Sequence, residues 1–496
     1  MVVVLWLDIP TFLYTYYKHL RISKRLDNAG LPTHWLWGSL PYLVDHEERF
    51  RIATTVVQKT RAKVSRFWVG PLIMSVAVGH PDTAKIILRE PKNDHIYRLL
   101  KPWIGDGLLV SSGKKWFRNR RLLTPAFHYE ILKPYVQVSN ECLEILLKEW
   151  QKSAEKKEPV KVFDSISFLT LDILLQCAFS YKSDCQRTRT NAPYIKAMYT
   201  LLLLIVNRYL NLLHHIDWIY WMSSSGREMR RNCDLVHEQS ERVIKERKEV
   251  LGLVGTDADH DKALSVAKTK KKYLDFLDIL LTAVDEEGNG LTDSEIRDEV
   301  DTFMFEGHDT TTSGISWALY CLAKYPEHQE KIREEVKNVL MGRDWLEYDD
   351  LKDLKYTLWC IKEAMRLYPP VIETNRQLSK DTELDGVVIP KGTRVSVSIP
   401  TLHYHPDVWD NPNEYDPLRF HPSSADGRDP YAYLPFAAGS RNCIGQSFAL
   451  NEERVVIATI VSKFRLSLVP EHCVTPMSLG ILKSNNDILL YIEQNI

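Results

Sequence analysis

The sequence predicts a mainly helical protein with a small β region, formed by one large domain behind a short N-terminal segment. Apolar residues recur at helical spacing through most of residues 80 to 370, as in Tyr135–Gln151 and Ser165–Phe179. The protein has 496 residues, of which 44% are hydrophobic and 26% are charged, so it can build a substantial core. This composition excludes a disordered protein and a small disulfide-stapled module.

The N-terminus is an apolar run, MVVVLWLDIPTFLYTYY, followed by four basic residues between positions 18 and 25. Seventeen residues are marginal for crossing a hydrocarbon core of about 30 Å. We expect residues 1–25 to be a short membrane anchor with a basic flank, and residues 26–496 to form a single domain. The positive flank favours a cytosolic location for that domain. The alternative is an N-terminal segment that packs against the domain.

Charge and cysteine content limit the class of protein further. Lys and Arg number 64 against 65 Asp and Glu, which gives a net charge of -1 and predicts no nucleic-acid partner. Eight cysteines are too few for a disulfide scaffold in a protein of this length, and most lie in apolar helical runs. We therefore expect a reduced compartment and buried, unreactive thiols, with one exception described below.

One long helix is predicted to begin at Thr292 and to end near Tyr325. Thr292 and Glu295 form a capping box, in which each side chain satisfies a free backbone amide of the first turn. The middle of this helix, residues 305–314, reads FEGHDTTTSG. Poor helix formers and acids on every face of a long core helix indicate a functional site rather than a polar outer stripe.

Strand-like runs come late in the sequence. Residues 387–389 and 395–397 flank Pro390-Lys391-Gly392, which suggests a hairpin. Residues 488–492 are expected to pair with residues 478–482 across an Asn-Asn turn. The acidic run at residues 285–290 resembles the start of a calcium loop, but Ile296 stands where a carboxylate is needed, so we interpret it as a turn.

The exceptional cysteine is Cys443, in the segment FAAGSRNCIG at residues 436–445. Gly439 and Gly445 bracket it and allow the backbone to approach a flat ligand closely. Arg441 and the start of the following helix supply positive charge that favours a thiolate. With no second Cys or His beside it in the sequence, the pattern favours a metal site with a single thiolate ligand.

The pattern Phe-x-x-Gly-x-Arg-x-Cys-x-Gly resembles the heme-binding signature of the cytochrome P-450 monooxygenases. Three more segments agree with that family in its order: Trp116-x-x-x-Arg120, Glu363-x-x-Arg366 and Pro417-x-Arg419-Phe420. A finer resemblance is to the family-4 branch of fatty-acid ω-hydroxylases, in residues 301–311 (DTFMFEGHDTT), 103–109 (WIGDGLL) and 122–128 (LLTPAFH). The resemblance implies the cytochrome P-450 fold and a heme-thiolate catalytic domain over residues 26–496.

The resemblance also implies roles for single residues. Cys443 would be the axial ligand of heme b, with Phe436 beside it. Trp116 and Arg120 would meet one heme propionate, and Arg441 with Arg376 the other. A structural network would brace the fold behind the heme, made of Glu363, Arg366 and Arg419.

On the oxygen-binding side, the resemblance makes Asp309 and Thr310 an acid–alcohol pair that delivers protons. In the family-4 branch, a glutamate at the position of Glu306 can form an ester with a heme methyl group. An anchored heme would help to direct oxidation to the terminal carbon, whose C–H bonds are stronger than those of the internal carbons. The alternative is an uncrosslinked glutamate that lines the site.

The implied reaction is hydroxylation of fatty acids or related lipids at or near the ω carbon, with O2 and electrons from NADPH. The implied partners are NADPH-cytochrome reductase, cytochrome b5 and the endoplasmic reticulum membrane, with the domain on the cytosolic face. Four basic residues around Trp116, namely Lys114, Lys115, Arg118 and Arg121, could dock an acidic reductase, or could be a solvated helix face.

Three other functions remain open at this stage. They are a heme-thiolate isomerase or dehydratase of lipid peroxides, a xenobiotic monooxygenase of broad specificity, and a non-catalytic heme protein. The first and third do not need the proton relay of Asp309 and Thr310. Dependence on NADPH and a reductase would separate them from a monooxygenase.

Overall fold

The computed structural model describes residues 16–17, 20–26, 34, 37–69, 73–92, 95–189, 192–253 and 274–495. The apolar run that we interpret as an anchor lies almost entirely outside the described residues, as does most of the polar linker between α14 and α16. The α-helices are α3 (Leu40–Leu43), α4 (His46–Thr60), α5 (Pro81–Ile87), α6 (His95–Ile104), α7 (Gly113–Leu123), α8 (Tyr129–Leu132), α9 (Tyr135–Lys156), α10 (Val162–Phe179), α11 (Cys185–Thr188), α12 (Ala192–Leu210), α13 (Asp217–Met222), α14 (Ser224–Leu251), α16 (Phe276–Thr282), α17 (Asp293–Lys324), α18 (Pro326–Leu340), α19 (Lys355–Leu367), α20 (Ile399–His403), α21 (Pro422–Ala425) and α22 (Gln446–Lys463).

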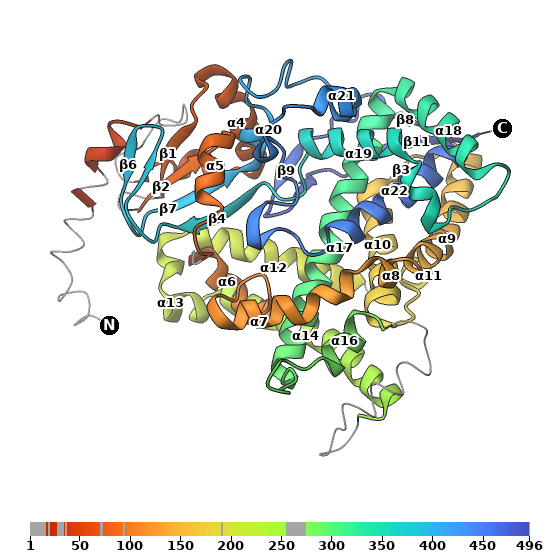
Figure 1. The fold of residues 1–496 in the computed structure, drawn as a ribbon, viewed down its shortest axis with the longest axis horizontal. Coiled ribbons are helices and arrows are strands. Elements are labelled where there is room, and N and C mark those ends of the chain that lie inside the picture. Colours follow the sequence, from red (N-terminus) through yellow and green to blue (C-terminus); the bar gives the residue numbers. More distant parts are fainter. Residues whose placement is uncertain are drawn as a thin grey trace.

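Short 3-10 helices and strands complete the fold. The 3-10 helices are η1 (Thr124–Phe127), η2 (Leu212–His215), η3 (Tyr348–Lys352), η4 (Pro417–Phe420), η5 (Pro430–Ala432) and η6 (Gly439–Arg441). The strands are β1 (Val64–Val69), β2 (Ile73–Val78), β3 (Val160–Lys161), β4 (Glu373–Gln377), β5 (Thr382–Leu384), β6 (Val387–Ile389), β7 (Arg394–Ser398), β8 (Phe464–Leu468), β9 (Pro476–Ser478), β10 (Leu482–Ser484) and β11 (Leu489–Gln494). The prediction of a mainly helical protein with a small β region is confirmed (Figure 1).

Helix α17 runs through the middle of the helical part of the molecule (Figure 1). It begins as predicted, with the Thr292 side chain accepting from the Glu295 amide and the Glu295 carboxylate accepting from the Thr292 amide. The helix packs against α10, α19 and α22, and most of its residues are buried. At ~1.5 Å per residue, its 32 residues extend roughly 50 Å. It can therefore present side chains from several turns to one internal site.

Both strand pairings expected from the sequence are wrong. Strand β6 pairs with β5, whereas β7 joins the separate sheet β1-β2-β7-β4, so no hairpin links β6 to β7. Strand β11 pairs with β8 and β3, and β10 pairs with β9. The sequence predicts strands mainly in the C-terminal third. Strands β1 and β2, however, come from the first hundred residues. Local turn signals do not reveal pairings between strands hundreds of residues apart.

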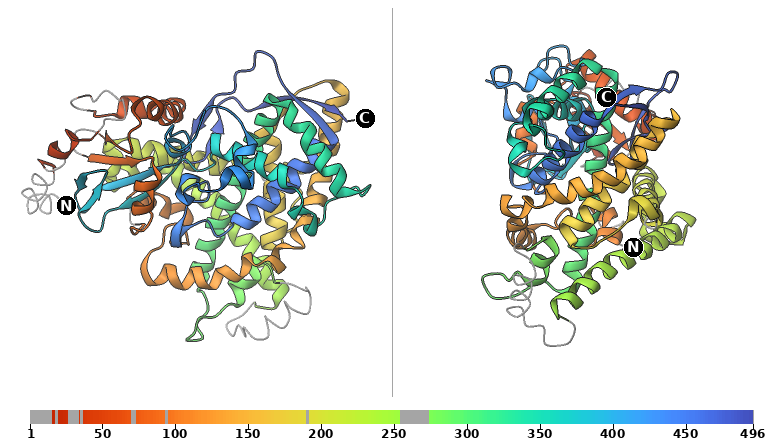
Figure 2. Two further views of the ribbon diagram at one scale, coloured as in Figure 1. Left: turned by 45° about the horizontal axis from the view of Figure 1, so that its top comes forward. Right: turned by 90° about the vertical axis from the view of Figure 1, so that its right-hand side faces the viewer.

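The sheet β1-β2-β7-β4 lies at one end of the molecule, beside the helical part (Figures 1 and 2). A separate cluster of buried apolar residues lies beneath this sheet, including Val76, Val395 and Val397. A much larger cluster joins α9, α10, α17, α19 and α22. Among the described residues, one helix, α10, is long and apolar enough to cross a membrane. Because α10 is buried against α17 and α9, its hydrophobicity is that of a core helix.

Candidate heme-thiolate site

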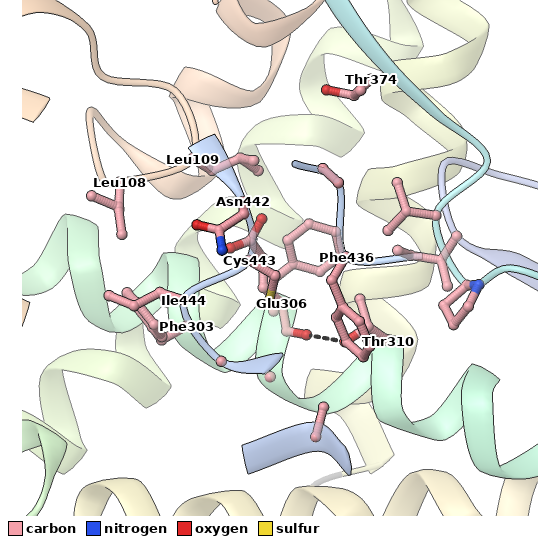
Figure 3. A pocket seen from close by; sticks show the side chains of 18 of the residues that line it. Leu108, Leu109, Phe303, Glu306, Thr310, Thr374, Phe436, Asn442, Cys443 and Ile444 are labelled. Atoms are coloured by element: carbon pink, nitrogen blue, oxygen red, sulfur yellow. Dashed lines mark hydrogen bonds between the residues drawn. The ribbon is translucent and has the colours of Figure 1, made fainter. Parts of the chain in front are cut away.

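A cavity of about 350 Å³ lies between α17 and the loop that precedes α22. Its walls are mostly apolar and come from α6, α7, α12, α17, β4 and the cysteine loop. Figure 3 shows Glu306, Thr310, Phe436 and Cys443 converging on this space. The cavity therefore lies between the two segments that the sequence singles out, although they are more than 120 residues apart.

Glu306 and Thr310 stand one turn apart on α17 and both line the cavity. The Thr310 hydroxyl donates to the Glu306 backbone carbonyl at 2.6 Å (Figure 3). Thr311 and Thr312 bond back to carbonyls of the preceding turn in the same way. These bonds let hydroxyl-bearing residues remain inside a helix that they would otherwise weaken. Burial raises the pKa of the Glu306 carboxyl, and Lys92 partly opposes this effect.

Asp309 does not line the cavity. Its buried carboxylate forms an ion pair with Lys483 of β10, with 2.8 Å between Oδ1 and Nζ. The Lys483 ammonium also lies over the Tyr199 ring, 3.1 Å from its centroid. Burial lowers the pKa of Lys483, and the Asp309 carboxylate opposes that shift. Asp309 and Thr310, the predicted acid and alcohol, are thus neighbours in sequence. In this structure, however, the Asp309 carboxylate is paired with Lys483 and does not face the cavity.

The cysteine loop places the thiol of Cys443 in the cavity wall. The Cys443 amide donates to the Phe436 carbonyl at 2.9 Å, which closes the loop. Gly439 adopts φ +78°, a backbone conformation that disfavours other residues, and Gly445 is the N-cap of α22. Gly439 does not itself line the cavity.

Burial raises the pKa of the Cys443 thiol to about 12, and Glu306 adds to the shift. The Gly445 amide, Arg120 and Lys92 oppose the shift, so the charges that favour a thiolate are not those of Arg441 as the sequence suggested. The protein alone therefore leaves this thiol protonated at neutral pH. A metal cation bound at the sulfur would deprotonate it outright.

Three arginines gather on one side of the cavity, and no salt bridge joins them to an acid in the part of the chain that the structure describes. The Arg441 guanidinium stacks over the Trp116 ring at 3.9 Å, and Arg120 donates to the Asn442 carbonyl at 2.9 Å. Arg376 lies behind this wall and does not line the cavity. Nη1 of Arg441 and Nε of Arg376 are buried and have no hydrogen-bond partner among the described residues.

A buried N–H group without a hydrogen-bond partner lowers the stability of the folded protein unless a ligand accepts its hydrogen bond. The arrangement therefore fits a flat cofactor that carries a metal for the thiol and acidic groups for the arginines. Lys92, also in the wall, adds a further positive group, and burial lowers its pKa to about 7.

The three residues expected to brace the fold are also together. Arg366 meets both oxygens of Glu363 at 2.7 and 2.8 Å, and Arg419 Nε lies 3.3 Å from Glu363 Oε1. Arg366 also donates to the backbone carbonyls of His403, Pro412 and Glu414. Glu363 and Arg366 have no solvent exposure. None of the three residues lines the cavity.

A second acid borders the cavity where α17 and α22 cross. Glu453 of α22 lies so close to Gly314 of α17 that a Cβ at position 314 would be 2.3 Å from Glu453 Oε1. Burial raises the pKa of Glu453 to about 8. Glycine at position 314 is thus required by the close approach of a carboxyl group, and that carboxyl is neutral at pH 7.

The basic face of α7 is partly neutralised by the turn that resembled a calcium loop. Arg118 pairs with Asp285 and Arg121 with Glu286 of this turn, each at 2.7 Å. Lys115 lies 3.3 Å from Asp106, which is not in the turn but between α6 and α7. The acidic turn is therefore a docking element for α7. The free positive charge of this face is smaller than the sequence suggested.

Sequence reasoning missed four residues of the site: Lys92, Asn442, Glu453 and Lys483. Asn442 stands inside the cysteine motif, where its role as the partner of Arg120 could have been suspected. Lys483 and Lys92 carry no local signal, because an ordinary lysine gains significance only from the distant groups beside it. Glu373 of β4 is a further acid that lines the cavity.

The sequence model of the family described as Cytochrome P450 matches residues 29–490. A human protein named ultra-long-chain fatty acid omega-hydroxylase is 45% identical over 470 residues, which cover 93% of this chain and 87% of the relative. Cytochrome P450 4A14 of Rattus norvegicus is 44% identical over 483 residues, covering 97% and 92%.

Among solved structures, the crystal structure of the cytochrome P450DA heme domain superposes with a TM-score of 0.81. Its sequence identity is 24%, and the alignment covers 95% of this chain and 98% of that one. This likeness shows that the two proteins share a fold. Together with the family match over nearly the whole sequence, it leads to one conclusion: the chain belongs to the cytochrome P450 family.

Proposed function

We propose that this protein is a membrane-bound monooxygenase that hydroxylates fatty acids or related lipids at or near the ω carbon. The observation that carries the proposal is the convergence of Glu306, Thr310 and Cys443 on one largely apolar cavity. The relatives support the substrate class, since one of them is named as a fatty acid omega-hydroxylase. An apolar cavity suits an alkyl chain, whose transfer from water is favourable by about 25 cal/mol per Å².

The residues present fit heme b. Cys443 would ligate the iron, and Phe436 beside it would keep water from the sulfur. Trp116, Arg120 and Arg441 would receive the propionates, with Arg376 behind them and Lys92 as an additional cation. When bound, the thiolate-ligated heme iron activates O2, and electron donation from sulfur favours cleavage of the O–O bond.

Thr310 and Asp309 would deliver protons to the oxygen-binding side. The Thr310 hydroxyl lines the cavity, and its bond to the Glu306 carbonyl fixes its position. Asp309 would accept a proton from Lys483. Its side chain would then change rotamer and carry the proton to the side of the cavity. The Lys483 ammonium, 2.8 Å from Asp309 Oδ1, would donate that proton and would stay a neutral amine until it is protonated again.

Glu306 would set the regioselectivity. It lines the cavity from a long helix that is mostly buried, so its backbone position is fixed. An ester between this carboxyl and a heme methyl group would hold the heme in one orientation. A fixed heme disfavours the shifts that would bring the weaker C–H bonds of internal carbons to the reactive centre.

Exposed apolar side chains support attachment to a membrane beyond the N-terminal segment. Leu213, Trp218 and Met222 are exposed around η2 and α13, and Trp37 and Tyr42 are exposed beside α3. The two groups are neighbours, because α3 and the end of α12 share a small apolar cluster. We place this face against the cytosolic leaflet of the endoplasmic reticulum. Electrons would come from NADPH-cytochrome reductase, with cytochrome b5 as a second donor.

Product regiochemistry tests the proposal. The holoenzyme would be incubated with reductase, NADPH and saturated or polyunsaturated fatty acids, and the products identified by mass spectrometry. We expect mainly ω alcohols, and a shift toward ω-1 in Glu306→Ala. Heme that stays with the unsubstituted protein after denaturation, but leaves the Glu306→Ala protein, would support the ester.

Two outcomes would contradict the proposal. Turnover of lipid peroxides without NADPH or reductase would indicate an isomerase or dehydratase. Failure to hydroxylate any fatty acid, together with oxidation of unrelated apolar compounds, would indicate a xenobiotic monooxygenase. Glu306→Gln serves as the matched control, because it keeps the size of the side chain while removing the acid.

A further inference from the structure

Glu373 is an acid in the wall of an otherwise apolar channel. It begins β4, and its Oε2 accepts from the Ser396 hydroxyl of the neighbouring strand at 2.9 Å. Glu373 lines the main cavity, and it also lines a second cavity of about 150 Å³. One residue therefore borders both cavities.

The second cavity lies between α4 and the sheet β1-β2-β7-β4. Its walls are mainly apolar, with Ile52 and Val56 on the helix side and Phe67 and Ala77 on the sheet side. Among the described residues that line it, Arg49 and Glu373 are the charged ones. A small apolar cavity that contains two opposite charges suits a ligand with a polar end and an alkyl chain.

Arg49 has hydrogen-bonding capacity that the described residues do not use. Its Nη2 donates to the Ser478 carbonyl at 2.8 Å and contacts His46, whereas its Nε is buried with no partner in the described part of the protein. Ser478 directly precedes Leu479, Gly480 and Ile481, which line the main cavity. The guanidinium is thus placed beside the channel by its bond to Ser478.

The charges of Arg49 and Glu373 interact electrostatically, although the two side chains form no ion pair. Burial lowers the pKa of Arg49, and the carboxylates of Glu373 and Asp45 and the Tyr209 hydroxyl oppose the shift. No ion pair within 4.0 Å joins the Arg49 and Glu373 side chains in the part of the protein that the structure describes. A gap between a partly unsatisfied guanidinium and a tethered carboxylate leaves room for a second anion on the arginine.

We propose that Arg49 binds the carboxylate of the fatty-acid substrate, with the head group in the second cavity and the alkyl chain running past Glu373 into the main cavity. A guanidinium presents paired N–H donors that match the two oxygens of a carboxylate. Glu373 weakens this attraction by placing a like charge near the bound head group. The inference rests on the proposed hydroxylation of fatty acids, and it names the group that holds the end of the substrate remote from the reaction.

This arrangement predicts opposite effects for two substitutions in the same cavity. Arg49→Gln removes the cation, so the Kd of a saturated C16 acid should rise about tenfold, equivalent to ~1.4 kcal/mol. Glu373→Gln removes the like charge and should lower the Kd of the same acid about threefold. The methyl ester of that acid carries no charge, so its Kd should change less than about twofold in either variant.

The measurement is equilibrium binding of the C16 acid and of its methyl ester to the holoenzyme, together with product regiochemistry. Arg49→Lys keeps the positive charge and should retain part of the preference for the acid. Arg51→Gln is the matched control, because Arg51 lies on the same helix, is exposed, and pairs with Glu48 away from both cavities. It should leave both affinities unchanged.

Two results would overturn the inference. In the first, Arg49→Gln changes the affinities for acid and ester equally, which would indicate a packing effect. In the second, neither Arg49→Gln nor Glu373→Gln changes the preference for acid over ester, while ω alcohols are still formed. The proposed function would then stand without this head-group site. Failure of the unsubstituted enzyme to hydroxylate any fatty acid would overturn both.

Discussion

Two of the buried ion-pair systems in the described part of the chain differ in how fully each charge is satisfied. Around Glu363, both carboxylate oxygens are bonded, and Arg366 reaches three backbone carbonyls as well. Asp309 and Lys483 have a single close contact with each other, and Lys483 also lies over a tyrosine ring. Glu363 thus has a partner on each carboxylate oxygen, whereas Oδ2 of Asp309 has no hydrogen-bond partner among the described residues.

This difference matches the two proposed roles. A buried charge that keeps all its partners stabilises one conformation. Removing one partner leaves the other charge buried and unpaired, and this lowers the stability of the folded protein strongly. A buried pair with one contact is marginal, because the attraction between the charges barely offsets the cost of burying them. The network around Glu363 is therefore suited to stabilising the fold, and the Asp309–Lys483 pair is suited to proton transfer.

The largest effect is expected from breaking the network around Glu363. Arg366→Met leaves the Glu363 carboxylate buried with Arg419 as its remaining cation, and should cost about 3–5 kcal/mol of stability. Little soluble holoenzyme should accumulate, as measured by heme content and protease resistance. A variant as stable as the unsubstituted protein would show that the Glu363 network does not stabilise the fold more than the Asp309–Lys483 pair does. Arg465→Met, an exposed arginine paired with Glu330, is the control.

The next effect concerns the Asp309–Lys483 pair. Lys483→Met should leave a folded holoenzyme whose rate of product formation falls about 100-fold, because the proton path through Asp309 is lost. NADPH consumption should continue without matching product, and the pH dependence of product formation should change shape. Lys483→Arg keeps the charge and should recover much of the activity. Normal coupling in Lys483→Met would show that the pair is only structural.

The smallest effect is a change in the pH dependence of stability, caused by Glu453. Its pKa is about 8 in the folded protein and near 4.5 in the unfolded state. Between these values the unfolded state releases the proton and the folded state keeps it, so stability falls as pH rises from about 4.5 to about 8. Below 4.5 both states are protonated, and above 8 both are ionised.

Glu453→Gln removes this source of pH dependence. The loss of stability between pH 5.5 and pH 8.5 should shrink by roughly 2–4 kcal/mol at most, measured by denaturant or thermal unfolding at both pH values. Glu158→Gln, at an exposed position, should not change the profile. An unchanged profile in Glu453→Gln would mean that the acid is not held neutral at the crossing of α17 and α22.

The parts of the molecule that sequence predicts well are those with local signatures. The capping box fixes the start of α17, and the spacing within residues 436–445 is enough to identify the cysteine loop. Helical periodicity likewise predicts α9 and α10, because each buries one or more faces at a regular spacing.

The parts that sequence predicts poorly depend on contacts between distant segments. One of the two partners of β7 is β2, more than 300 residues earlier, and the Arg49 guanidinium donates to a carbonyl 429 residues away. No periodicity or turn signal encodes such a pairing. Lys483 shows the same limit at the site, since its sequence context is an ordinary strand and its importance comes from Asp309 alone.

The parallel pairing of β2 with β7 also affects how the protein reaches its native state during synthesis. The β2 edge that accepts residues 394–397 has no partner until those residues have been made. At about 5–20 residues per second, the ribosome needs roughly 15–60 s to cover that distance. During this interval an apolar strand edge is available for aggregation, so this protein should depend on chaperones early in translation, well before the cysteine loop emerges.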